Sequence, residues 1–237
     1  MQETPIMNIN DNYTRSNIVR ILFYAMMGMD IISAYSNILQ LNLLKSAEIS
    51  MIGIDMEQAD ANDSRQQIVA IFHLLLIVAT IVTFIMWYYR AYKNLHELKV
   101  LSLQHTPGWA IGAWFVPFLN LGRPYTIMKE IWENTQNFVV SKDDLIRPSS
   151  NAIIGWWWGF WLFSNFLSNI SGRITLQATT IEQMITSTQV SIFSDAVDMV
   201  SVIMTLIMLT RMVDYEKKLW DFLNDPMNSI NKTEIAN

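Results

Sequence analysis

Four long apolar stretches constrain the fold of this chain more than any other feature. They cover residues 18–44, 68–89, 151–170 and 192–213. The hydrocarbon layer of a membrane is about 30 Å thick, and about 20 residues of helix are needed to cross it. Each stretch is that long. The sequence therefore predicts an all-α membrane protein with four transmembrane helices.

Composition favours a lipid environment and argues against several classes of function. Apolar residues make up 51% of the chain and charged residues only 16%, whereas roughly a quarter of the residues in soluble proteins are charged. The net charge is -5, and no cluster of Lys and Arg is visible, so nucleic acid is not an expected partner. The chain has no cysteine, which excludes disulfides and thiolate metal sites.

The polar segments set the expected domain boundaries. We expect a polar N-terminal tail over residues 1–17, a single membrane domain over 18–213, and a cytoplasmic tail over 214–237. The first apolar stretch lacks a basic start and a small-residue cleavage site, so it is read as a retained anchor. Within the final tail, the pattern to about residue 223 fits a short interfacial helix, and the residues from 224 on are expected to be disordered.

Residues 106–139 contain a further apolar run that is too short and too interrupted for a span. The run covers 109–121, a length typical of re-entrant or interfacial segments. Pro117 removes a backbone donor in its middle, and Asn120 and the Arg123-Pro124 step follow. We expect residues 106–139 to form a re-entrant or interfacial element on the cytoplasmic side. The alternative is a full span kinked at the proline.

An amphipathic helix is expected to complete this element over residues 125–139. One stripe at helical spacing is mainly apolar. It consists of Met128, Ile131, Trp132, Thr135 and Phe138, whereas Lys129, Glu130 and Glu133 lie elsewhere.

The distribution of basic residues distinguishes the two topologies, because Lys and Arg near span ends are retained on the cytoplasmic side. If residues 106–139 do not cross, 13 of the 16 Lys and Arg residues lie inside, and only Lys45, Arg65 and Arg173 lie outside. If the segment crosses, 6 lie inside and 10 outside. The count therefore predicts four spans with both termini in the cytoplasm.

Three sequence blocks resemble a known family. They are YRAYKNLHEL (89–98), TPGWAIGAWFVPFLNLGRPYTIMKEIW (106–132) and GWWWGFWLFSN (155–165). Together they are similar to the bacterial integral-membrane family catalogued as domain of unknown function 4328. The matching core of the second block consists of Trp114, Phe115, Pro117, Asn120, Arg123 and Pro124. Gly122 departs from the family, in which an aromatic residue commonly precedes the Arg-Pro step.

This resemblance is strong over residues 89–165 and loose in the flanking spans. It implies a multi-pass protein of the bacterial cytoplasmic (inner) membrane with no assigned activity. It leaves the mechanism open.

Four polar residues fall inside the predicted spans, where ionisable groups are costly. Counted from the span ends, Asp30, His73, Asn165 and Asp198 all lie in the outer half of the membrane. Bundled helices would allow them to form one cluster that binds a cation or relays protons. The competing interpretation is that they only hold helices together or lie at the interface.

Two further sets of residues suggest contacts. The Gly155 and Gly159 pair has the Gly-x-x-x-Gly spacing that permits close helix packing, within the chain or in a dimer. Basic residues on the cytoplasmic side could contact anionic lipid headgroups, although the positive-inside rule explains them equally well. These are Arg90, Lys93, Lys99 and Arg123.

No catalytic motif is present. There is no second His at metalloprotease spacing after His96-Glu97, no phosphate-binding Gly-Lys-Ser/Thr loop and no Gly-x-Ser-x-Gly elbow. We therefore expect no enzyme, no cofactor and no metal site. The favoured role is a non-catalytic interaction, scaffold or accessory subunit, with the bilayer and an unidentified membrane protein as partners. A small ion- or proton-coupled channel or transporter is the alternative, and a lipid-modifying membrane enzyme is a third possibility.

Overall fold

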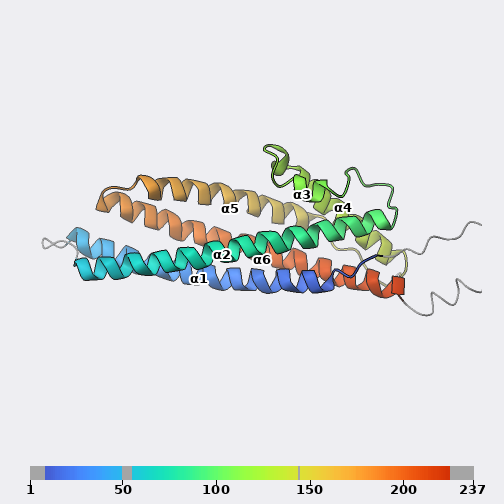
Figure 1. Ribbon diagram of the computed structural model, residues 1–237, viewed down its shortest axis with the longest axis horizontal. Coiled ribbons are helices and arrows are strands. Elements are labelled where there is room, and N and C mark those ends of the chain that lie inside the picture. Colours follow the sequence, from blue (N-terminus) through green and yellow to red (C-terminus); the bar gives the residue numbers. More distant parts are fainter. Residues whose placement is uncertain (1–8, 50–54, 144, 225–237) are drawn as a thin grey trace, which may run out of the picture. The chain divides into compact units, whose positions relative to one another are not determined.

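The computed structural model describes residues 9–49, 55–143 and 145–224, and all regular structure within them is helical. The prediction of an all-α protein is therefore confirmed for the described residues. The elements are α1 (Tyr13–Ile49), α2 (Met56–Glu97), α3 (Trp109–Gly112), the 3₁₀ helix η1 (Leu119–Leu121), α4 (Arg123–Val140), α5 (Ala152–Gln177) and α6 (Ile181–Asn224) (Figure 1).

Three of these helices, α1, α2 and α6, are long and apolar enough to cross a membrane. In the most apolar window of α2 only 11% of the residues are buried, so its apolar side chains face outward. The helix α5 has 26 residues and exceeds the length of a span at about 1.5 Å per residue. It is absent from this set because its Trp and Asn residues lower its mean hydropathy.

The helices extend beyond the predicted spans. α1 begins at Tyr13, inside the predicted N-terminal tail, and α6 continues to Asn224, through the predicted boundary at 213. The segments beyond the apolar stretches contain residues with good helix propensity such as Glu, Gln, Lys and Leu, so each helix continues once it has formed. Disorder was predicted from Asn224 on, but Asn224 is the last residue of α6. The residues after it and the first part of the N-terminal tail lie outside the described residues.

The chain forms two compact units. The first comprises Met1–Arg20, Ile81–Gly155 and Ile207–Asn237, and the second comprises Ile21–Thr80 and Trp156–Leu206. Each unit has its own interior and is described separately below.

The interior of the first unit is aromatic and aliphatic. α2 contributes the buried side chains of Trp87, Tyr88 and Tyr92. On α4, the buried residues Met128, Ile131, Trp132 and Thr135 confirm the predicted stripe. Across the unit, the ring of Trp132 on α4 lies 6.4 Å from that of Tyr215 on α6.

Glu130 of α4, which lies off the predicted stripe, is also buried. Its Oε2 accepts a hydrogen bond of 2.6 Å from the Tyr92 hydroxyl. The backbone N–H of Gln104 also donates to this carboxylate. A buried carboxylate is stable only when donors surround it, and the spacing pattern of α4 alone could not reveal those donors.

The second unit is built from parts of α1, α2, α5 and α6, which lie side by side (Figure 1). Met26, Val202 and Leu206 form an apolar core. Hydrogen bonds join α1 to α2 through Arg65 and Ser36, and α1 to α6 through Gln40 and Thr188. α5 is joined to α6 by two serine pairs. This unit contains the predicted polar cluster.

Candidate functional site

Three of the four predicted cluster residues meet in the second unit. Asp30 comes from α1, His73 from α2 and Asp198 from α6, and each can offer one ligand atom such that all of these atoms lie within 4.8 Å of one another. The Nε2 of His73 is 3.4 Å from Oδ1 of Asp30. Three separate helices thus bring two carboxylates and one imidazole close together.

The burial of this cluster is uneven. Only 1% of the Asp30 side chain is exposed, against 21% of the His73 side chain. Neither Oδ2 of Asp30 nor Nε2 of His73 has a hydrogen-bond partner, and both atoms are buried. Buried polar atoms normally have partners, so this cluster is under-satisfied as it stands.

Asn165 does not join the cluster, contrary to the prediction. Its side chain is exposed and donates to the backbone carbonyl of Trp161 on its own helix. The preceding residue, Ser164, is buried and donates a hydrogen bond of 2.5 Å to Oδ1 of Asp198. Adjacent helix positions point about 100° apart, so a count of residues from the span end does not distinguish Asn165 from Ser164.

A second carboxylate on α6 is already satisfied. Oδ2 of Asp195 accepts hydrogen bonds from Nδ2 of Asn37 at 2.9 Å and from the hydroxyl of Ser33 at 3.2 Å. Asp195 therefore fits the interpretation of polar residues that hold membrane helices together. It contrasts with Asp30, which lacks such donors.

The Pro-containing element, residues 106–122 of the first unit, does not form a long helix. Residues 106–122 contain only the short α3 and η1. The guanidinium of Arg123 stacks 4.0 Å above the ring of Trp109, and Trp114 packs edge-on against Phe84 and Tyr88 at 5.8 Å. Residues 106–122 therefore do not form one continuous helix.

Three apolar side chains of this segment are exposed. Phe115 is 70% exposed, Phe118 87% and Leu121 55%. Phe118 also has a φ of 65°, which is unusual for a bulky residue. These three side chains are exposed although Trp109 and Trp114 of the same segment are packed against other side chains.

The other predicted residues of this motif have structural positions. Pro117 is exposed and Asn120 is half-buried. Pro124 is buried in the first turn of α4, and its carbonyl accepts a hydrogen bond of 2.6 Å from the Tyr88 hydroxyl.

Two of the four basic residues predicted to contact lipid are already engaged. Arg90 pairs with Glu97 and with the side chain of Asn94, and Arg123 is stacked on Trp109. Lys93 is half-buried and Lys99 is exposed.

The predicted helix packing at Gly155 and Gly159 is not found within the described chain. A Cβ added at either position would meet nothing within 4 Å, and both glycines are exposed. Their surface is open, so the intramolecular contact that the spacing suggested is absent.

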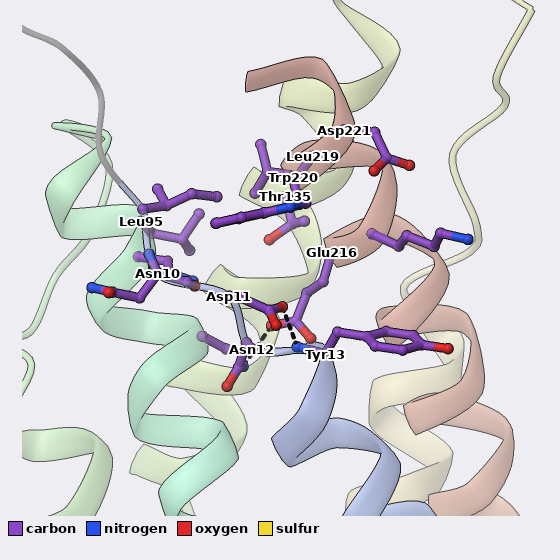
Figure 2. Close-up of a pocket in the computed structure, with 14 residues that line it drawn as sticks. Asn10, Asp11, Asn12, Tyr13, Leu95, Thr135, Glu216, Leu219, Trp220 and Asp221 are labelled. Atoms are coloured by element: carbon purple, nitrogen blue, oxygen red, sulfur yellow. Dashed lines mark hydrogen bonds between the residues drawn. The ribbon is translucent and has the colours of Figure 1, made fainter. Parts of the chain in front are cut away.

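The first unit also contains a pocket of about 240 Å³ that sequence reasoning missed (Figure 2). It lies between the segment before α1 and the helices α2, α4 and α6. Glu216 lines it, accepting hydrogen bonds from Nδ2 of Asn12 and from Nε1 of Trp87, each at 2.9 Å. Burial raises the pKa of Glu216 to about 7. Asn12 lay in a predicted polar tail, and no pattern linked it to Glu216.

Comparison with known proteins gives one match. A family model described as Domain of unknown function (DUF4328) matches residues 51–214, which is more than half of the chain. No curated protein matches the chain. No solved structure matches it either.

Proposed function

The chain belongs to the family Domain of unknown function (DUF4328), and we propose that it is a four-span membrane protein with a non-catalytic role as a scaffold or accessory subunit. The element around Pro117 seats its exposed apolar side chains in the cytoplasmic-side membrane interface. It thereby holds the first unit against the membrane surface, where a membrane-protein partner binds. The observation that carries this proposal is the exposure of Phe115, Phe118 and Leu121 beside packed tryptophans.

Energetics favour lipid as the neighbour of these side chains. Burying a Phe or Leu side chain contributes about 1.5–3 kcal/mol relative to leaving it in water. Three such side chains on one element supply enough to hold a segment at the interface of a protein that is already anchored. The backbone of a short irregular segment keeps its polar groups satisfied by turns: the Asn120 N–H donates to the carbonyl of Val116, as irregular backbone at membrane depth requires.

The distribution of charge supports the proposed topology. Of the 13 basic residues that the four-span count places in the cytoplasm, all but Lys232 lie in described parts of the first unit, and Lys232 lies outside the described residues. The three predicted to lie outside, Lys45, Arg65 and Arg173, all belong to the second unit. A grouping based on contacts thus agrees with a grouping based on charge alone.

We assign α5 as the remaining span, in addition to α1, α2 and α6. Its Trp156 is 62% exposed and lies near the first residue of the helix, where amphipathic rings suit the headgroup region. Trp158 and Trp161 stack with ring centroids 4.8 Å apart. Low mean hydropathy in a Trp-rich helix is compatible with a span whose end lies at the interface.

A fluorescent reporter at Phe118 tests the proposal. The chain has no cysteine, so Phe118→Cys can be labelled with an environment-sensitive dye in the full-length protein in lipid nanodiscs. We expect blue-shifted emission that spin-labelled lipids quench. The control is Ser141→Cys, on an exposed residue just after α4, which should give emission typical of water. Emission typical of water at both positions would contradict the interfacial seat of the element.

A further inference from the structure

We propose that Asp30, His73 and Asp198 form a binding site for a divalent transition-metal ion. The three side chains come from α1, α2 and α6, and their ligand atoms lie within 4.8 Å of one another. All three belong to the second unit. This proposal concerns a different part of the chain from the Pro-containing element and does not depend on the role proposed for that element.

The distance between Nε2 of His73 and Oδ1 of Asp30 fits two ligands of one metal ion. At 3.4 Å, it exceeds the usual length of a charged N–H to oxygen hydrogen bond, about 2.7–2.9 Å. Two ligands held about 2.0–2.1 Å from a tetrahedral metal ion are about 3.3 Å apart. The observed spacing therefore suits two ligands of one ion better than a direct hydrogen bond.

The carboxylate of Asp30 has one oxygen without a hydrogen-bond partner. Its Oδ2 is buried without a hydrogen-bond partner, and the residue is only 1% exposed. Leaving a buried carboxylate oxygen unsatisfied costs free energy. A bound cation would remove that cost. Nε2 of His73, which lies 3.4 Å from Oδ1 of Asp30 and has no hydrogen-bond partner, is a nitrogen that metal ions commonly bind.

The negative charge of Asp30 and Asp198 also favours a bound cation. No Lys or Arg in the described part of the chain forms an ion pair with Asp30 or Asp198. Two carboxylates in a helical interior need a compensating charge. One divalent cation with a neutral imidazole balances them.

The donor set indicates the class of metal. One imidazole with two carboxylates and no thiolate suits Zn²⁺ or Mn²⁺. The hydrogen bond from Ser164 to Oδ1 of Asp198 fixes the orientation of that carboxylate, as outer partners of metal ligands do.

The sequence argued against a metal because the chain has only three His and no Cys. The structure changes that expectation because the ligand atoms of one His and two Asp lie within 4.8 Å of one another. The competing interpretation is a His–Asp pair that shares a proton and only joins helices, and the following experiment distinguishes the two.

The test uses the full-length protein in nanodiscs, without a His tag and treated with a chelator. ZnCl₂ or MnCl₂ is titrated in, and the bound metal is counted after gel filtration. The variants Asp30→Asn, His73→Gln and Asp198→Asn remove one ligand each. Asp195→Asn is the matched control, since it lies one turn away on the same helix and its carboxylate already accepts hydrogen bonds from Ser33 and Asn37.

We expect one metal ion per parent chain and a rise in Tm on binding. Each ligand variant should bind at least about tenfold more weakly, whereas Asp195→Asn should bind like the parent. If Asp30→Asn does not fold, His73→Gln carries the test, and loss of the imidazole nitrogen coupling from the electron spin resonance spectrum of bound Mn²⁺ is its readout. Absence of saturable binding by the parent, or unchanged binding by His73→Gln, would overturn the proposal.

Discussion

At the scale of single residues, the sequence predicted the position of a residue along its helix better than the face of the helix on which it lies. Asp30, His73 and Asp198 were predicted from their distance to the span ends, and the structure brings them together. Asn165 was predicted in the same way and is exposed, because counting residues along a helix does not determine which face each residue takes. Ser164, one position earlier, contacts Asp198 instead.

Glu216 shows what the sequence alone could not predict. Its partners Asn12 and Trp87 are far from it in the chain, and no periodic pattern links them. The residue lies three positions beyond the proposed span that ends at 213, so its surroundings are those of the first unit and not of lipid.

The raised pKa of Glu216 makes stability depend on pH. Burial raises this pKa from 4.5 to about 7 in the folded protein, so the folded state holds a proton that the unfolded state releases. The resulting stabilisation is full below about pH 4.5 and is lost as the pH rises through about 7. We expect the Tm of the parent to fall by roughly a few degrees between pH 5 and pH 8.

Glu216→Gln should reduce this fall, because the amide does not titrate and its oxygen can still accept a hydrogen bond. Thermal unfolding followed by tryptophan fluorescence would measure it. Glu182→Gln, on an exposed residue of the same helix, should retain the parental pH dependence. A Glu216→Gln profile with the parental slope would show that this carboxyl is not the source.

At the scale of elements, hydrophobic periodicity predicted the helices and missed their ends. The apolar stripe of α4 was predicted by spacing and is mainly buried. Helix up to about residue 223 was predicted as a short interfacial helix, but the early starts of α1 at Tyr13 and of α6 at Ile181 were not. The residues before those two spans are polar, and hydropathy alone does not separate a solvated helix from a loop. The turns of the Pro-containing element were predicted only as an interruption, since several backbone geometries fit the same sequence.

Arg65 is expected to stabilise the pairing of α1 and α2 in the second unit. Its Nε donates to the Ser36 hydroxyl at 3.0 Å, and its Nη2 donates to the Ser36 carbonyl at 3.2 Å and to Oδ1 of Asn62 at 2.5 Å. Hydrogen bonds of a charged group contribute about 1.5–3 kcal/mol.

Arg65→Ala should therefore lower the free energy of unfolding by about 1–3 kcal/mol, measured by denaturant titration in mixed micelles. Lys45→Ala, which removes an exposed basic residue of the same unit, should change it by less than about 0.5 kcal/mol. Equal effects of the two substitutions would mean that the hydrogen bonds of Arg65 contribute no more than an exposed charge does.

At the scale of the whole molecule, the proposed function requires one topology. Four spans place residues 106–139 and both termini on the cytoplasmic side and Lys45, Arg65 and Arg173 on the other. This topology is a prediction from the sequence, since the positive-inside rule depends on counts of Lys and Arg and not on contacts. The formation of two compact units could not be predicted, because it depends on side-chain contacts between segments that are distant in sequence.

Cysteine labelling in intact cells tests this topology most directly. Ser64→Cys and Ser141→Cys replace exposed serines in a chain with no other cysteine, and a membrane-impermeant thiol reagent reports the side of each. With four spans, Ser64→Cys labels in intact cells and Ser141→Cys labels only after lysis. Labelling of both in intact cells would show that residues 106–139 cross the membrane and would rule out the four-span topology.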